Sequence, residues 1–196
     1  DRILNEIEAM VAKSKQFVNI AYTPADLYRL KAEGKKAIML GIENGYAIGR
    51  DIRNVERFRR RGVVYMTLCH NGNNQLCGSC RFNDEGLGVN AFGEEVIHEM
   101  NRVGMMVDIS HAGDQTFYDA LDISTKPIVA SHSSSRALCN HPRNLTDEQL
   151  KALAIKGGVA QVTLHNGFLK EEGQATIQDA IAHLNHMVDV MGIEHV

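Results

Sequence analysis

The chain has 196 residues, of which 44% are hydrophobic and 23% are charged, and its formal net charge is −3. This composition excludes a disordered tail, and the absence of a basic excess argues against a nucleic-acid partner. No stretch approaches the roughly 18 to 20 apolar residues that cross a bilayer, so we expect no membrane segment in this chain.

Helical and apolar segments alternate along the chain. Two helices are predicted first, at 3–15 and after Thr23-Pro24, where Thr suits the N-cap and Pro the first helical position. Short apolar runs that are typical of buried strands follow at 37–42, 63–68, 105–109, 127–130 and 159–164. Further helices are predicted at 52–61, 92–103, 116–124, 147–156 and 177–191.

This alternation predicts one structural unit of the α/β class with a parallel sheet. Either a doubly wound sheet or a (β/α)8 TIM barrel satisfies the pattern. A barrel typically needs about 250 residues, so a barrel made by this chain would be incomplete at its ends.

Each predicted strand is followed by a glutamate or a histidine. These residues are Glu43, His70, His111, His132 and His165, and the chain as a whole contains nine histidines. A single histidine in such a place is more often a polar cap that is hydrogen-bonded to loop backbone. The carboxyl ends of neighbouring parallel strands meet, however, so five such residues together favour one shared site.

Several imidazoles and a carboxylate in one place suit a borderline cation such as Zn²⁺. Two histidines and one glutamate, with a water in the remaining position, form a known catalytic zinc arrangement. Bound zinc lowers the pKa of that water towards about 7. The pattern therefore predicts hydrolysis.

Five motifs carry a resemblance to a known family: Gly41-Ile42-Glu43-Asn44-Gly45, Leu68-Cys69-His70-Asn71, Val107-Asp108-Ile109-Ser110-His111, Ala130-Ser131-His132-Ser133-Ser134 and Pro142-Arg143-Asn144-Leu145-Thr146-Asp147. In order and approximate spacing they resemble the membrane (renal) dipeptidase family, peptidase family M19, over essentially the whole chain. The resemblance implies a (β/α)8 barrel with two zinc ions that hydrolyses dipeptides with a free carboxylate.

The resemblance also assigns roles to individual residues. It implies that Glu43 bridges the two metals and that His111 and His132 are ligands of one of them. It implies a catalytic role for His70, which would steady the carbonyl oxygen without binding metal. Arg143 would hold the terminal carboxylate of the substrate in a bidentate fork. His165 is a weaker candidate for a substrate contact, because it stands near a position that is tyrosine in relatives.

Two parts of the family pattern are missing. No His-x-Asp pair, which would bind the other zinc, occurs in the sequence, and the chain stops at 192–196, where the late strand with an essential Asp should start. We therefore expect residues 1–196 to be the central portion of a single catalytic domain, an incomplete barrel that lacks the first strand and the last strands. By itself this segment would hold one zinc ion or none and would not form a complete site.

Two alternatives remain: a metal-free α/β module that binds a small molecule, with 41–49 as its phosphate loop, and a catalytically inactive barrel. A measurement of bound metal separates both from the zinc dipeptidase. The compartment stays unknown and a homo-oligomer is left open.

Other candidate ligands have simpler interpretations. His183 and His186 are three residues apart and could bind metal, but a solvated helix face is favoured. Cys77 and Cys80 have the spacing of a redox or zinc pair, but ordinary loop thiols or a disulfide are favoured. Asp108 is either a partner that orients a ligand or a carboxylate held by backbone donors, and the serines around His132 are expected to orient it.

Overall fold

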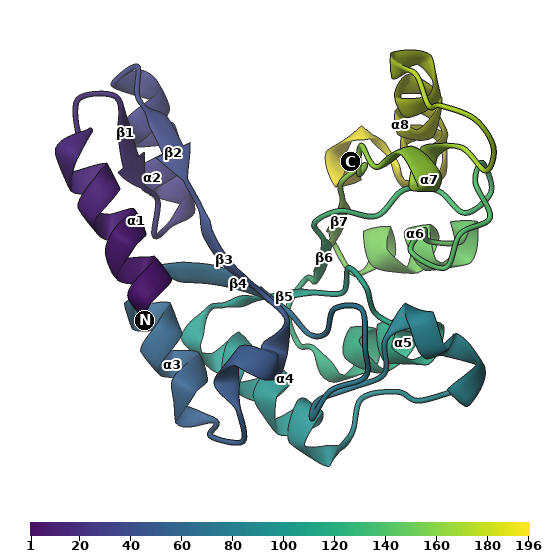
Figure 1. Cartoon of the computed structure of the whole chain (residues 1–196), viewed down its shortest axis with the longest axis horizontal. Coiled ribbons are helices and arrows are strands. Elements are labelled where there is room, and N and C mark those ends of the chain that lie inside the picture. The colour runs from purple at the N-terminus through teal and green to yellow at the C-terminus, as the bar shows by residue number, and fades with distance from the viewer.

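The computed structural model describes residues 1–196 (Figure 1). The helices are α1 (Arg2–Lys13), α2 (Pro24–Ala32), α3 (Arg53–Arg60), α4 (Ala91–Val103), α5 (Asp114–Ile123), α6 (Asp147–Ile155), α7 (Asn166–Leu169) and α8 (Ile177–Met191). The strands are β1 (Val18–Ile20), β2 (Lys36–Ile38), β3 (Leu40–Glu43), β4 (Val63–Thr67), β5 (Met106–Asp108), β6 (Val129–Ala130) and β7 (Val159–Ala160).

The main sheet has five parallel strands in the order β3-β4-β5-β6-β7. Helices α3, α4, α5 and α6 contact one another in the same sequence and lie around the outside of the curved sheet (Figure 1). A doubly wound sheet reverses its strand order at a switch point. Because this order never reverses, the doubly wound alternative is wrong and the sheet is part of a (β/α)8 barrel wall.

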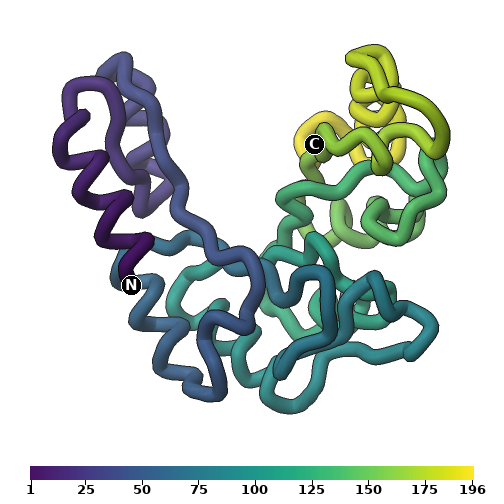
Figure 2. Tube along the Cα trace, in the orientation of Figure 1, coloured from purple at the N-terminus to yellow at the C-terminus, as the bar shows by residue number.

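The barrel wall is open. Strands β3 and β7 each pair on one side only. The N-terminal helices and the C-terminal helices rise on opposite sides of the sheet and the two termini lie apart (Figure 2). The incomplete barrel expected from the sequence is confirmed.

The predicted run 37–42 is two strands. Its first part, β2, pairs with β1 in a separate two-stranded parallel sheet, and its second part, β3, opens the main sheet. Strand β1 is too short to stand out as an apolar run in the sequence. Gly41 in β3 lies so close to Tyr65 that a Cβ would collide with the tyrosine ring.

Local signals set the helix boundaries well. The Thr23-Pro24 start of α2 is confirmed, since the Thr23 hydroxyl accepts from the backbone N–H of Asp26, whose carboxylate accepts from Thr23 N in turn. Gly104 adopts a left-handed backbone with φ of 73° and ends α4, where a side chain would be strained.

Residues from the sheet and the helices share one buried core. Met66 and Val107 of the strands are buried with Ile97 of α4 and Leu150 of α6 in the same cluster. Burial of each such side chain stabilises the fold by about 1.5–3 kcal/mol. None of the helices combines the length and the apolar composition that a membrane span needs.

Candidate active site

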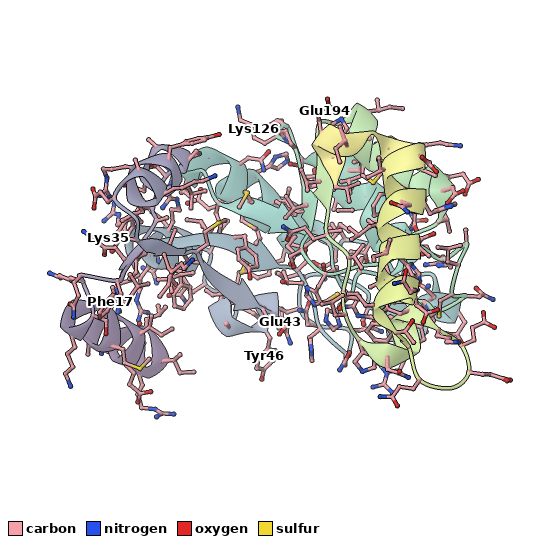
Figure 3. All side chains as sticks on the ribbon, turned by 90° about the horizontal axis from the view of Figure 1, so that it is seen from above. Phe17, Lys35, Glu43, Tyr46, Lys126 and Glu194 are labelled. Atoms are coloured by element: carbon pink, nitrogen blue, oxygen red, sulfur yellow. The ribbon has the colours of Figure 1, made fainter.

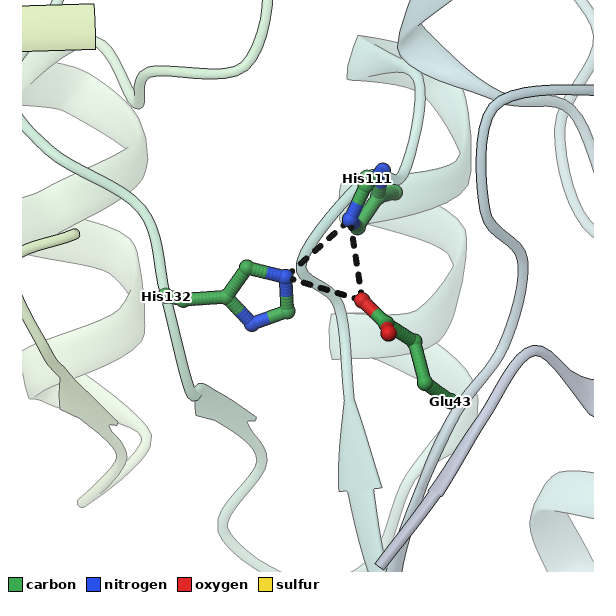
Figure 4. Close-up of side chains that lie close together, drawn as sticks. All are labelled: Glu43, His111 and His132. Carbon is green, nitrogen blue, oxygen red and sulfur yellow. Dashed lines mark hydrogen bonds and ion pairs between the residues drawn. The ribbon is translucent and has the colours of Figure 1, made fainter. Parts of the chain in front are cut away.

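The carboxyl ends of three strands bring Glu43, His111 and His132 together. Glu43 is the last residue of β3, and the two histidines follow the ends of β5 and β6. Figure 3 shows Glu43 between the N-terminal helices and the C-terminal helices, and Figure 4 shows the three side chains converging on one point. Parallel strands that end at one edge of a sheet produce this convergence.

The three candidate ligand atoms form a compact triangle. Glu43 Oε1 lies 3.3 Å from His111 Nε2 and 3.2 Å from His132 Nε2, and the two nitrogens are 3.0 Å apart. Two atoms that are each about 2.0–2.1 Å from one tetrahedral zinc ion are about 3.3 Å apart. The spacing of the triangle therefore fits a single zinc-sized cation.

A buried hydrogen-bond chain orients His132. Asp108 is fully buried and its Oδ2 accepts from the hydroxyls of Thr67 and Ser131 at 2.6 Å each. Because the Ser131 hydroxyl proton goes to Asp108, Ser131 Oγ accepts from His132 Nδ1 at 2.7 Å. His132 then carries its proton on Nδ1 and turns the lone pair of Nε2 to the triangle, which is the tautomer that a metal ligand needs.

Asp108 also holds the backbone around these ligands. Its Oδ1 accepts from the N–H groups of Ser110 and Ser131 at 3.0 Å each. One carboxylate thus ties the ends of β4, β5 and β6 together. Both roles considered for Asp108 apply, because the same side chain orients a ligand and accepts backbone donors.

His111 is held neutral and in an unusual conformation. Burial, together with the charge of Arg143, lowers the pKa of His111 to about 3. Its φ is 70°, and Asn44, the residue after Glu43, is the other non-glycine residue with a positive φ. Such conformations cost free energy and are typical of functional sites.

The donor set as a whole fits a divalent cation. Burial and Arg143 also lower the pKa of His132, so both imidazoles are neutral at pH 7 and can act as ligands. The His111 side chain is 7% exposed whereas Glu43 is 51% exposed. The site is therefore closed behind His111 and open at Glu43.

His70 lies beside the triangle and outside it. Its ring centroid is 4.3 Å from that of His111, and its Nε2 is 3.8 Å from Glu43 Oε1. His70 follows β4, the strand between β3 and β5, so its position at the strand ends agrees with the sequence pattern.

Arg143 lines a neighbouring cavity of about 320 Å³. The residue is 5% exposed, and its Nη2 donates to the backbone oxygen of His132 at 3.2 Å. Its Nε and Nη1 are buried without any partner, and burial lowers the pKa of the guanidinium. A buried cation with unused donors calls for an anion. The cavity is lined by Asn71, Cys80, Arg81, His141, Pro142, Arg143 and Phe168.

His165 is not at a strand end. The predicted strand 159–164 is wrong in its second half, since β7 ends at Ala160, and His165 is the N-cap of α7. The imidazole stacks on Phe168 with 4.2 Å between ring centroids. His165 therefore approaches the arginine cavity through Phe168.

One other expectation needs correction. His183 is 1% exposed, so the predicted solvated face of α8 is wrong at this residue. Its Nδ1 accepts from Ser135 N and its Nε2 donates to Leu169 O. Cys77 and Cys80 are free thiols as favoured, with no disulfide, but both are buried in the folded loop.

The sequence analysis missed Arg81 and Phe168. Both lie in or next to short helical turns, where no periodic pattern or strand end marks them. The Arg143 guanidinium carbon lies 5.3 Å from the centroid of the Phe168 ring, which shows the ring as a wall of the cavity.

A barrel-type parallel sheet whose strand ends gather two neutral imidazoles and one carboxylate is an arrangement typical of metal-dependent hydrolases of the (β/α)8 class. Residues 2–196 match the membrane dipeptidase family, peptidase family M19, and the chain belongs to that family.

Individual relatives agree with this assignment. An uncharacterized dipeptidase from Schizosaccharomyces pombe is 41% identical over 168 residues, which are 83% of this chain and 40% of that protein. The solved structure of an amidohydrolase from Pseudomonas aeruginosa is 33% identical with a TM-score of 0.91, over 96% of this chain and 57% of that one.

A metallo peptidase from Rhodobacter sphaeroides, solved with a phosphinate mimic of the dipeptide L-Ala-D-Ala, is 25% identical with a TM-score of 0.87. The similarity covers 96% of this chain and 56% of that one. The chain thus spans between two fifths and three fifths of the length of these relatives.

Proposed function

We propose that residues 1–196 are the central portion of the single (β/α)8 catalytic domain of a zinc-dependent dipeptidase. The observation that carries this proposal is the convergence of Glu43 Oε1, His111 Nε2 and His132 Nε2 at mutual distances of 3.0–3.3 Å. The open edges of the sheet at β3 and β7 support the domain assignment, because the rest of a barrel wall would cover them.

Glu43, His111 and His132 would hold the zinc ion. Zinc in such a site supplies a Lewis acid that activates water and polarises a carbonyl group. The half-exposed Glu43 also has a second oxygen free to bridge to another metal, in keeping with two zinc ions in a complete site. The residues of this chain by themselves account for one.

His70 is proposed to act on the peptide carbonyl of the substrate. Its ring lies next to His111 and 3.8 Å from Glu43 Oε1, so an N–H of the imidazole can donate to an oxygen located at the triangle. Such a donor stabilises the negative charge that develops when a carbonyl is attacked. His70 therefore acts without binding the metal.

Arg143 is proposed to bind the terminal carboxylate of the dipeptide. Its Nε and Nη1 are unpaired and buried, and Nη2 has a second N–H beside the one that it donates to the His132 backbone oxygen. A carboxylate can therefore be bound through two parallel hydrogen bonds from Nη2 and one of the unpaired nitrogens. The hydrogen bond from Nη2 to the backbone of His132 fixes the distance between this anchor and the metal ligands. His165 would contribute to substrate binding through its stacking on Phe168.

Zinc binding tests the proposal directly. We expect the chain to bind one zinc ion, measured by competition with a chromophoric chelator. Substitution of either His111→Ala or His132→Ala should weaken binding on the order of 100-fold or more. His98→Ala is the matched control, because His98 is exposed on α4 and outside the triangle.

Other outcomes distinguish the alternatives. Unchanged zinc affinity in both variants would contradict the site. Zinc binding without dipeptide hydrolysis by the full-length protein would favour a catalytically inactive barrel. Residues 1–196 alone are expected not to hydrolyse dipeptides, because no His-x-Asp pair is present for the second metal. Turnover of an ordinary dipeptide by this segment with added zinc would contradict that expectation.

A further inference from the structure

The arginine cavity contains a second cation that the proposed function does not use. Arg81 lines the same cavity of about 320 Å³ as Arg143. Its backbone N–H donates to Ser79 Oγ, but its guanidinium makes no hydrogen bond or ion pair in the structure. None of the residues that line the cavity is acidic. The cavity thus has two positive side chains and no negative one.

The loop that carries Arg81 is tied to the proposed active site. Ser79 Oγ donates to the backbone oxygen of His70 at 2.6 Å, and Cys80 N donates to the backbone oxygen of His111 at 2.9 Å. Ser79 and Cys80 are the two residues that precede Arg81 in the chain. The backbone of Arg81 is therefore held at a fixed place relative to the candidate ligands and to His70.

A single carboxylate cannot compensate both arginines. Burial and the charge of Arg143 lower the pKa of His141, which keeps this imidazole neutral and leaves the guanidiniums as the charges of the cavity. Arg143, buried and hydrogen-bonded to the backbone of His132, is suited to the α-carboxylate next to the scissile bond. Arg81 is exposed, and its long side chain can reach an anion that lies further out.

From this arrangement we propose that the site selects dipeptides whose C-terminal residue has an acidic side chain, aspartate or glutamate. The inference rests on the proposed function, since Arg143 takes the α-carboxylate there. Arg81 would bind the side-chain carboxylate, and the Phe168 ring would pack beneath Arg143. The two arginines would then discriminate between an acid and its amide, which have the same shape but different charge.

The test compares Ala-Asp with Ala-Asn by calorimetry on the metal-free protein, so that no ligand is consumed. We expect wild type to bind Ala-Asp about 10-fold more tightly, as for a charged pair near the surface. Arg81→Ala should reduce this ratio to about 1, and Arg81→Lys should restore part of it, because a point charge remains. Arg53→Ala, an exposed arginine at the start of α3, is the matched control and should leave the ratio unchanged.

Failure of the inference is distinguishable from failure of the proposed function. Equal affinity for Ala-Asp and Ala-Asn in wild type would overturn the inference while the proposed function stands. A preference that persists in Arg81→Ala would overturn the role of Arg81. If neither dipeptide binds to wild type, the carboxylate site at Arg143 is wrong, and the inference falls with it.

Discussion

The triangle of Glu43, His111 and His132 and the cavity of Arg143 lie side by side and suit ligands of opposite charge. Glu43, His111 and His132 present electron pairs that suit a cation, whereas Arg143 presents buried N–H donors that suit an anion. The two regions are joined by the hydrogen bond from Arg143 to the His132 backbone. A cation would suit the first region and a carboxylate the second, as the proposed dipeptidase function requires.

The two regions are also built differently. The triangle stands on strand ends that Asp108 ties together through short buried hydrogen bonds. The cavity is formed by the loop around Pro142 and by the short helical turns that carry Arg81 and Phe168. Backbone geometry varies less at strand ends than in the segments that connect them. We therefore expect changes at the triangle to affect metal binding and changes at the cavity to affect substrate choice.

Arg143→Met is expected to give the largest difference between the effects on the two regions. Dipeptide affinity should fall about 100-fold, because charge-assisted hydrogen bonds are lost. The free energy of unfolding of the ligand-free protein should rise by about 1 kcal/mol, because an uncompensated buried charge is removed. Zinc affinity should not fall. Calorimetry and urea unfolding measure these effects.

Arg143→Lys is the companion variant. It keeps the charge but loses the planar fork, so dipeptide affinity should lie between wild type and Arg143→Met. Wild-type affinity in both variants would show that the dipeptide carboxylate binds elsewhere.

A smaller effect, confined to the triangle, is expected from Ser131→Ala. Removal of the hydroxyl breaks the link from Asp108 to His132 Nδ1. Loss of such a supporting contact lowers metal affinity by about 10- to 100-fold. Chelator competition measures it. The matched control is Ser135→Ala, whose buried hydroxyl has no partner, and equal zinc affinity in the two variants would contradict the orienting role.

The smallest effect concerns the scaffold behind the cavity. His183 joins the loops that carry Arg143 and Phe168, through Ser135 N and Leu169 O. Burial lowers the pKa of His183, whereas the unfolded chain has an ordinary value of about 6.5. Below that value the unfolded state binds more protons, so stability falls as the pH decreases.

His183 changes the free energy of unfolding by up to about 1.4 kcal/mol per pH unit. His183→Gln should make the decrease in unfolding free energy between about pH 7 and 5 shallower, as measured by urea unfolding. The other buried histidines act equally in both proteins and cancel in the comparison. His98→Gln, on an exposed face of α4, should keep the wild-type slope, and an unchanged slope in His183→Gln would contradict the shift.

Much of the scaffold could be predicted because its signals are local. The 3.6-residue periodicity predicts a helix at 177–191, and α8 spans Ile177–Met191, with a capping box at Thr176 where it begins. The alternation of helices and apolar runs predicts a parallel sheet, and parallel strands that end at one edge bring Glu43, His111 and His132 together. Family motifs supplied the expected role of Arg143, which the strand pattern does not mark.

Other features depend on contacts between distant segments. The run 37–42 divides only because β1 pairs with its first half. The helical periodicity around His183 does not reveal that Ser135 and Leu169 cover its side chain. His165 caps a short helix because β7 ends early.

By itself the sequence determined the α/β class and five strand-end candidates, since strand periodicity and strand-end chemistry are encoded within a few residues. The family motifs selected Glu43, His111 and His132 among them as the expected metal ligands. Only the tertiary structure decided that the Ser131 hydroxyl links Asp108 to His132 Nδ1, that β2 leaves the main sheet to pair with β1, and that Arg81 faces the cavity of Arg143. The physical reason is that hydrogen bonds and charges in loops take their partners from segments far apart in the chain, and no local pattern records those partners.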